Sequence, residues 1–397
     1  MTRRVPIVVA ALGTTQTLAW GSSFYLPAIL GVPIATALGI APTLFFGFFS
    51  AALLLSAATA PYVGQLIDRH GGRAVLACSN VVLAAGLVLL GLSQGVVSLA
   101  LAWLVLGVGM AMGLYDPAFA ALTRLYGRNA RAPITGITLI AGFASTIGWP
   151  ASAWFEHVFG WREACLIWAA INLFVAMPLN CWAIPSAPPL PAKSHGVPEE
   201  PEIAAPLGTM AILAYFFSAT RFVSGAFAAH LPGLLQGTGA SEVAAIAAAA
   251  LVGPAQVGAR LVEFGFLRSF HPVIAARIAS VLHPLGAGFL VALGPAGAAV
   301  FAVLHGAGNG MITIAKGTLP LAIFGPAGYG LRNGILSVPT RVAEASAPLL
   351  FGLLLAGIGS QAVLVTAGLC LSAFASLWLL RAREAPVPAP RSAAASD

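Results

Sequence analysis

Long apolar runs separated by short polar gaps fill almost the whole sequence. A helix that spans a bilayer needs about 20 mostly apolar residues, and twelve runs have that character. They lie near Pro6–Leu30, Pro42–Leu66, Ala74–Gly91, Val97–Leu122, Pro133–Phe155, Trp161–Ile184, Leu207–Leu231, Glu242–Leu261, Val273–Leu293, Ala296–Phe324, Ile335–Ala356 and Gln361–Leu380. The pattern predicts an all-α membrane protein with twelve transmembrane helices.

The composition agrees with a chain that is surrounded by lipid. Hydrophobic residues make up 59% of the 397 residues and charged residues only 8%, whereas a soluble domain carries about 25% charged residues. Such a chain has too few charges to cover a surface that faces water.

Positive charge is distributed unevenly among the gaps. One alternate set of gaps and ends holds Arg3, Arg4, Arg69, Arg73, Arg124, Arg128, Arg131, Lys193, Arg268, Arg332, Arg381 and Arg383. The other set holds almost none, with Arg162 as its exception. Because Lys and Arg stay on the cytoplasmic side, both termini are expected there. The net charge of +7 therefore reflects orientation, and no nucleic-acid partner is expected.

The longest polar stretch runs from about Pro185 to Pro206 and lacks apolar periodicity, which is typical of a linker. It divides the spans into two sets of six. We predict a first six-helix bundle over residues 1–185, a cytoplasmic linker over 186–206, a second six-helix bundle over 207–382 and a disordered tail over 383–397.

The two halves share a short pattern. Gly107-Val-Gly109 precedes Asp116 in the fourth span, and Gly306-Ala-Gly308 precedes Lys316 in the tenth. Duplicated halves around a central site are a common design for alternating access.

The gap between spans two and three reads Gly64-Gln-Leu-Ile-Asp68-Arg69-His-Gly71-Gly72-Arg73. Glycine permits a tight turn there, and an acid or guanidinium beside a helix end can hold neighbouring helices together. The segment resembles the signature loop of the major facilitator superfamily, Gly-x-x-x-Asp-Arg/Lys-x-Gly-x-Arg. That resemblance implies a gating role for Gly64, Asp68, Arg69, Gly71 and Arg73, and two pseudo-symmetric bundles around a cavity that opens alternately to each side.

Shorter motifs resemble the monocarboxylate and oxalate/formate branch of that family: Trp20-Gly-Ser-Ser-Phe-Tyr25, Arg131-Ala-Pro-Ile-Thr-Gly136, Gly160-Trp-Arg162 and Gln256-Val-Gly-Ala-Arg260. In monocarboxylate carriers an Asp four residues before the eighth-span Arg couples protons to the anion. Here that position is Gln256, an amide that cannot titrate. The resemblance implies anion binding by Arg260 without that proton route.

Charges within the spans are the main candidates for a site, because each costs roughly 2.5–3.5 kcal/mol on insertion scales. Arg221, near the middle of span seven, either binds an anion or forms a structural pair. Asp116 by resemblance pairs with the signature-loop arginines in a cytoplasmic gate, or else carries a proton. Lys316 either lines the cavity or extends towards the cytoplasm. Arg341 and Glu344, three residues apart, are expected to pair with each other or to line the cavity.

His305 and Asn309 lie four residues apart on span ten and share one face. They either contact substrate or a proton, or they bond a neighbouring helix. Trp20, Tyr25, Tyr115 and Phe217 are candidate aromatic walls of the pocket. The predicted substrate-binding set is thus Arg221, Arg260, Lys316, Asn309, His305, Trp20 and Tyr25.

These features predict a monomeric secondary transporter of a small organic anion in a bacterial inner membrane. Protons are a candidate coupling ion, and no cofactor, resident metal or enzymatic activity is expected, since phosphate-loop and hydrolase motifs are missing. The alternative is an efflux carrier for arsenite or drugs, in which Cys78, Cys165 or Cys181 would bind the metalloid. A receptor on the same scaffold and a channel are the other classes considered.

Overall fold

The computed structural model describes residues 5–186, 206–267 and 270–380, and every regular element in these ranges is a helix. Apart from residues 186 and 206, the predicted linker lies outside the described residues, as does the whole predicted tail over 383–397.

Ten α-helices make up the first half: α1 Val5–Ser22, α2 Pro27–Ala37, α3 Pro42–His70, α4 Gly72–Gly91, α5 Val96–Gly113, α6 Tyr115–Tyr126, α7 Arg131–Ala141, α8 Ala144–Phe159, α9 Trp161–Ile171 and α10 Met177–Ala183. Seven make up the second half: α11 Leu207–Gly237, α12 Glu242–Ala250, α13 Val252–Val262, α14 Pro272–Leu293, α15 Ala298–Phe324, α16 Tyr329–Ile358 and α17 Ala362–Ser376. Several spans are therefore built from two helices in series.

Within the described residues, nine helical stretches are long and apolar enough to cross a membrane. Three of them, with 64, 53 and 48 residues, are much longer than the roughly 20 residues of one crossing. Each contains a 3₁₀ turn that opens with a glycine at positive φ, namely Gly127, Gly294 or Gly359. Only glycine adopts that conformation without strain, so the chain reverses there. Division at these turns gives twelve spans, as predicted.

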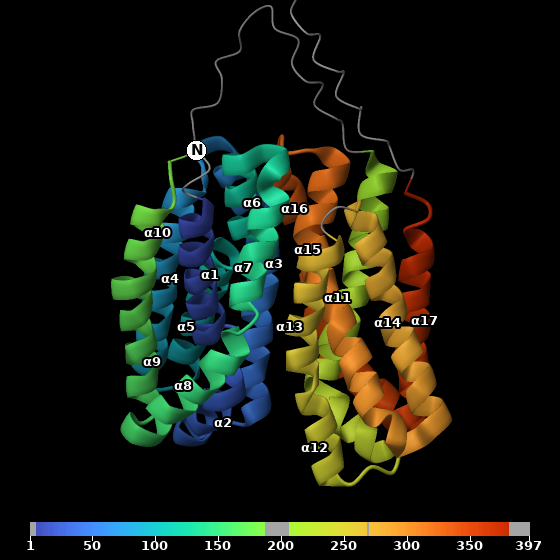
Figure 1. Cartoon of the computed structure of the whole chain (residues 1–397). Coiled ribbons are helices and arrows are strands. Elements are labelled where there is room, and N and C mark those ends of the chain that lie inside the picture. Colours follow the sequence, from blue (N-terminus) through green and yellow to red (C-terminus); the bar gives the residue numbers. More distant parts are fainter. Residues whose placement is uncertain (1–4, 187–205, 268–269, 381–397) are drawn as a thin grey trace, which may run out of the picture.

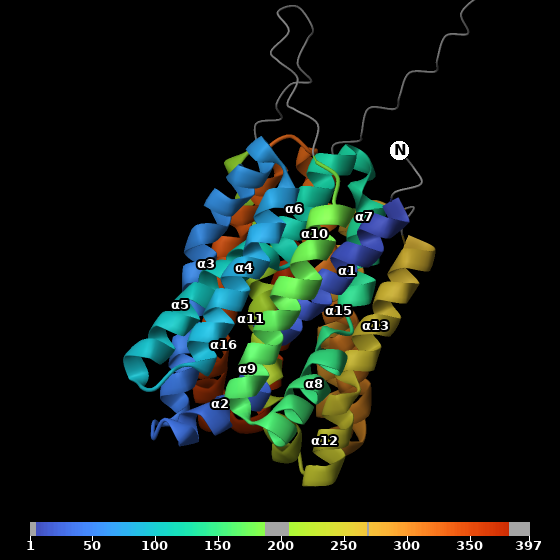
Figure 2. The same cartoon turned by 90° about the vertical axis from the view of Figure 1, so that its left-hand side faces the viewer.

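Two helical bundles stand side by side in Figure 1, the first half in blue to green and the second in yellow-green to red, and Figure 2 views the molecule from the side of the first bundle. Each bundle has its own buried apolar clusters: one in the first bundle surrounds Trp103 and Trp168, and one in the second surrounds Phe301 and Phe351. The bundles meet chiefly where α3 packs along α16, and also where α7 packs against α13 and α15.

Contact between the bundles is uneven along their length. We call the end at which α3 ends and α16 begins the loop end, which lies at the top of Figure 1. At the opposite end, α2 and α8 pack only against their own half to any appreciable extent, and so does α12, among the described residues. The two bundles are thus held together near the loop end.

Four span limits differ clearly from those predicted. The first span continues past Leu30 to Ala37, the seventh past Leu231 to Gly237 and the eighth past Leu261 to Leu267. The eleventh begins at Tyr329 ahead of the predicted Ile335, because Arg332 and Asn333 look like loop residues by hydropathy although both belong to the first turns of α16.

Candidate functional site

Asp116 lies where the fourth span changes from α5 to α6. The helical backbone is interrupted at Leu114, whose ψ is −161°, and α6 begins directly before Asp116 and Pro117. Proline is well suited to a first helical turn because it lacks the N–H that would be unpaired there. An acid in that turn also interacts favourably with the helix dipole. The sequence thus places a carboxylate deep within the span, where it is only 7% exposed.

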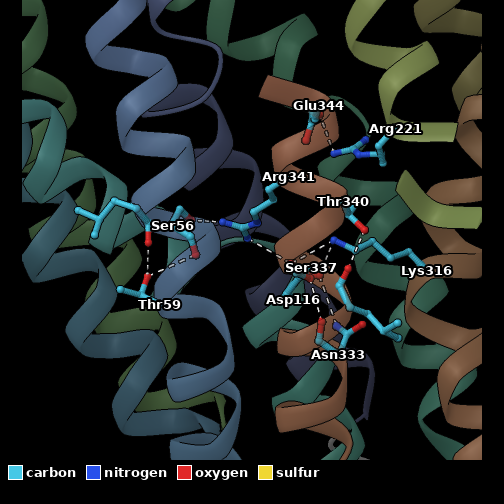
Figure 3. A network of polar contacts seen from close by, with 12 residues as sticks. Ser56, Thr59, Asp116, Arg221, Lys316, Asn333, Ser337, Thr340, Arg341 and Glu344 are labelled. Carbon is cyan, nitrogen blue, oxygen red and sulfur yellow. Dashed lines mark hydrogen bonds and ion pairs between the residues drawn. The ribbon is translucent and has the colours of Figure 1, made fainter. Parts of the chain in front are cut away.

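Within the described ranges, all the side-chain partners of this carboxylate come from the second half (Figure 3). Lys316 Nζ lies 2.9 Å from Oδ1, and Arg341 Nη2 lies 3.1 Å from Oδ2. The hydroxyl of Ser337 donates to Oδ2 at 2.7 Å, and the amide of Asn333 donates to Oδ1 at 3.4 Å. One acid of the first bundle therefore joins α15 and α16 of the second.

The expected partners of Asp116 were wrong in this respect, since it does not pair with the signature-loop arginines. Asp116 lines one small space together with Gly64 and Gly330, so the signature loop is close by. The carboxylate is instead taken up by Lys316 and Arg341 of the second half, while Arg73 donates to Ser186.

The predicted pair between Arg341 and Glu344 is also wrong. Glu344 instead receives Arg221 of α11, with 3.1 Å between Nη2 and Oε1. Although the two α16 residues share a face, each extends to a different neighbouring helix (Figure 3). Arg221 thus has the structural pair that was the alternative to anion binding.

The signature loop seals the loop end in a different way. The Asp68 carboxylate accepts the backbone N–H groups of Gly330 and Leu331, both at 2.8 Å, and so caps the N-terminus of α16 from the other bundle. Gly64 approaches so closely that an added Cβ would overlap the carbonyl of Gly330. Gly71 ends α3 with a φ of +86°.

The two basic residues of that loop do not reach the central site. Arg73 donates to the hydroxyl of Ser186 at 3.1 Å, and Arg69 is exposed. They flank the junction that Gly64 and Asp68 form.

A second group of predicted residues meets at the centre of the interface. Trp20 packs against Tyr25 and Tyr115, with ring centroids 5.9 and 5.0 Å apart. Both tyrosines lie within electrostatic range of Arg221 and Arg260 from the other bundle. The structure therefore brings Trp20, Tyr25, Arg221 and Arg260 into one region.

Arg260 is 5% exposed and bridges the halves through carbonyl groups. Its Nη1 donates to the carbonyl of Thr138 on α7 at 3.1 Å, and its Nε donates to that of Gly310 at 3.4 Å. No carboxylate lies within ion-pair distance of Arg260 in the described part of the chain.

His305 and Asn309 lie apart from this region, in a small cavity inside the second bundle. The cavity is lined by both residues and by Ser224 and His283, among others. Ser224 Oγ lies 2.7 Å from Asn309 Oδ1, and His283 bonds His305. The two predicted residues share one face of α15, as expected from their spacing.

Sequence reasoning missed Ser56, His283, Asn333 and Ser337. Three of them are polar residues inside predicted spans, where such residues usually bond a neighbouring helix, so a search that included uncharged polar residues would have identified them. Asn333 precedes the predicted start of its span at Ile335 and gave no such signal. The cysteines do not converge: Cys165 and Cys370 are buried in different bundles, and no group of three His, Cys, Asp or Glu suited to a metal occurs among the described residues.

Comparison with known proteins agrees with this architecture. Over 346 residues the chain is 29% identical to an uncharacterized 38 kDa protein encoded in a 23S RNA operon of Thermoproteus tenax, covering 86% of each protein. It is 30% identical to mouse monocarboxylate transporter 11 over 213 residues, or 51% of this chain and 46% of that one. The solved structure of the proton:xylose symporter XylE superposes with a TM-score of 0.76 over 96% of each chain, at 13% identity, and so shows the fold alone. The Major Facilitator Superfamily model matches residues 12–299. The chain is therefore a membrane transporter, not an enzyme, and belongs to the Major Facilitator Superfamily.

Proposed function

We propose that this transporter is a secondary carrier that moves a small organic anion, such as a monocarboxylate, by alternating access. One observation carries the proposal: the central network holds more basic than acidic groups. Lys316 and Arg341 share the single carboxylate of Asp116, while Arg221 faces Glu344. Three cations against two anions leave an excess positive charge within the membrane, where an unbalanced charge is costly. A substrate carboxylate would balance it.

Arg221 is the anchor in this proposal. Its Nε has no hydrogen-bond partner among the described residues although the atom is buried, and its side chain is 21% exposed. A guanidinium presents several donors in a planar fork that suits a carboxylate, so Nε and Nη2 are available for a bidentate contact once Glu344 shifts. Trp20 and Tyr25 would contact the organic part of the substrate, and Arg260 would add positive charge from the other side.

The Asp116 network supports the gating part of the proposal. It joins the bundles near the loop end, and Asp68 and Gly64 join them at that end itself. Opening towards the loop end requires these contacts to break together. With the basic gaps facing the cytoplasm, as expected in a bacterial inner membrane, the described state is closed to the cytoplasm.

The experiment combines ligand-induced stabilisation with transport. Purified protein is heated with L-lactate, oxalate, arsenite or a cationic drug, because a ligand at about 100 times its Kd stabilises by about 2.7 kcal/mol. In proteoliposomes, radiolabelled lactate counterflow then separates a carrier from a channel. We expect stabilisation by a carboxylate in the wild type and its loss in Arg221→Ala.

Two further variants sharpen the result. Arg221→Lys keeps the charge but removes the fork, and we expect about tenfold weaker carboxylate binding. Glu344→Gln removes the competing acid and is expected to bind the carboxylate more tightly than the wild type. Stabilisation by arsenite or the drug alone would refute the anion carrier and favour the efflux alternative.

A further inference from the structure

The second bundle contains a pair of histidines that the anion site does not use. His283 of α14 and His305 of α15 are 4% and 5% exposed, and their Nδ1 atoms lie 3.0 Å apart. The rings of Phe227 and Phe301 pack against both imidazoles. Two basic side chains in an apolar setting are expensive unless each polar atom has a defined partner.

Hydrogen-bond directions assign the hydrogens of this pair. The hydroxyl oxygen of Thr366 lies 2.8 Å from the carbonyl of Val363 and 3.0 Å from Nε2 of His283. We assign its single hydrogen to the carbonyl, which can only accept, and this makes Nε2 of His283 the donor in the second contact. A neutral imidazole carries one hydrogen, so the Nδ1 of His283 is an acceptor and the Nδ1 of His305 donates to it.

This assignment leaves the Nε2 of His305 as a free acceptor. The ring of His305 lines the cavity that also contains Ser224 and Asn309. A proton taken up at this nitrogen leaves all the hydrogen bonds of the pair in place. A second proton would put hydrogens on both facing Nδ1 atoms and break their contact. The geometry therefore accommodates one proton and excludes two.

Other titratable groups around the pair do not compete for this proton. Cys370 of α17 also lines the cavity, and His230 of α11 bonds the carbonyl of Pro348. The charged groups on surrounding helices have partners elsewhere: Arg221 with Glu344, Arg341 and Lys316 with Asp116, and Arg260 and Arg277 with backbone carbonyls.

We propose that the His283–His305 pair is the coupling-proton site of this carrier, with the proton held on Nε2 of His305. The inference rests on the proposed anion transport for its role in coupling, although proton binding itself does not require it. In the loading step a hydronium ion in the cavity gives its proton to the lone pair of Nε2, which forms an N–H bond and leaves water. The cavity is also lined by Ser224, one turn from Arg221 on α11, so one helix carries both a cavity residue and the anion anchor.

The first experiment determines which ring nitrogens of His283 and His305 carry a hydrogen. Histidine-selective ¹⁵N NMR on the full chain in nanodiscs is recorded from about pH 8 to about pH 4, a range that includes the ordinary histidine pKa of about 6.5. We expect the Nδ1–H tautomer at His305, the Nε2–H tautomer at His283, and uptake of one proton by the pair. His305→Gln and His283→Asn assign the signals, and His230→Gln is the matched control. Independent titration of both rings, or no titration of either, would overturn the proposal.

The second experiment tests coupling in proteoliposomes with radiolabelled L-lactate. Equilibrium exchange at equal pH needs no net proton movement, whereas uptake driven by an inward proton gradient does. We expect His305→Gln to keep exchange and to lose about tenfold of the gradient-driven uptake, within the usual range of coupling between sites. His230→Gln should behave as the wild type.

The outcomes separate this proposal from the anion proposal. Coupling through the pair would be refuted if His305→Gln kept its gradient-driven uptake. It would also be refuted if lactate uptake by the wild type did not respond to the proton gradient. If the wild type does not move lactate at all, the anion proposal fails for this probe, and the NMR titration alone decides whether the pair binds one proton.

Discussion

We compare two junctions between the bundles. They differ in whether backbone or side-chain atoms make the contact. At the first junction, α3 and α16 meet backbone to backbone at Gly64 and Gly330, and Asp68 caps α16. At the second junction, α7 and α13 are connected by a side chain: Arg260 of α13 donates to the carbonyl of Thr138 on α7. Arg131 similarly donates to the carbonyl of Leu267 at 3.1 Å.

This difference follows from the sequence of the two loops. The first junction contains the complete signature, with glycine where the helices touch and an acid where α16 begins. The corresponding segment of the second half, Gly258-Ala-Arg260-Leu-Val-Glu263, is degenerate. A close backbone contact permits one geometry, whereas a flexible side chain can follow a moving carbonyl. We therefore infer that the first junction sets the closed state and that the second adapts to it.

The largest effect is expected for Asp116→Asn, next to the first junction. The amide leaves Lys316 and Arg341 without a balancing carboxylate, and removal of one member of a buried ion pair costs about 3–5 kcal/mol. Thermal unfolding of the purified protein in one detergent measures the loss of stability. Ser337→Ala, which removes one neutral donor to the same carboxylate, should cost only about 1 kcal/mol.

A double variant provides the critical control. Asp116→Asn combined with Lys316→Met returns the network to its original excess of one charge and should recover part of the stability. Equal unfolding temperatures for Asp116→Asn and the wild type would show that the network does not stabilise the closed state.

Gly64→Ala is expected to have the next largest effect. Its Cβ would overlap the Gly330 carbonyl, which belongs to a backbone that cannot move alone. We expect the closed population at the loop end to fall about 100-fold relative to the open one, equivalent to about 2.7 kcal/mol. Gly258→Ala is the matched control, because nothing lies within 4 Å of its added Cβ.

Electron spin resonance measures that population. Labels are attached to His70→Cys and Ala327→Cys, both exposed at the loop end, in a chain whose own cysteines are replaced by serine. Gly64→Ala should shift the distance distribution to longer values while Gly258→Ala leaves it unchanged. A shift in both variants, or in neither, would contradict the distinction between the junctions.

Features that depend on residues close in the chain could be predicted from the sequence, whereas contacts between helices could not. The twelve spans and the family follow from hydropathy and from the signature loop, because both depend on residues that are close in the chain. The ion pairs do not: Arg341 and Glu344 share a face of α16, but their partners lie on other helices. Spacing along one helix identifies neighbours within that helix and says nothing of which charge a second bundle presents.

The cavity inside the second bundle shows another limit of prediction from the sequence. Hydropathy and charge drew attention to His305 and Asn309, while His283 was overlooked. Its importance comes from one contact, the 3.0 Å between two ring nitrogens from α14 and α15. Such a contact depends on how two helices are rotated against each other, which no single-helix pattern encodes.

The smallest effect is expected for Gly142→Ala at the second junction. An added Cβ would lie 2.5 Å from Nη1 of Arg260, but this atom ends a flexible side chain and can move aside. The hydrogen bond to Thr138 would weaken, at a cost of about 1 kcal/mol, and no gain in helix propensity offsets it because α7 ends at Ala141. The free energy of unfolding should therefore fall by about 1 kcal/mol, with Gly253→Ala on α13 as the control, because its Cβ meets nothing within 4 Å. The label distance at the loop end should remain that of the wild type. A loss of closure as large as in Gly64→Ala would mean that the second junction is as rigid as the first, and that the degenerate loop has kept the geometry of the complete one.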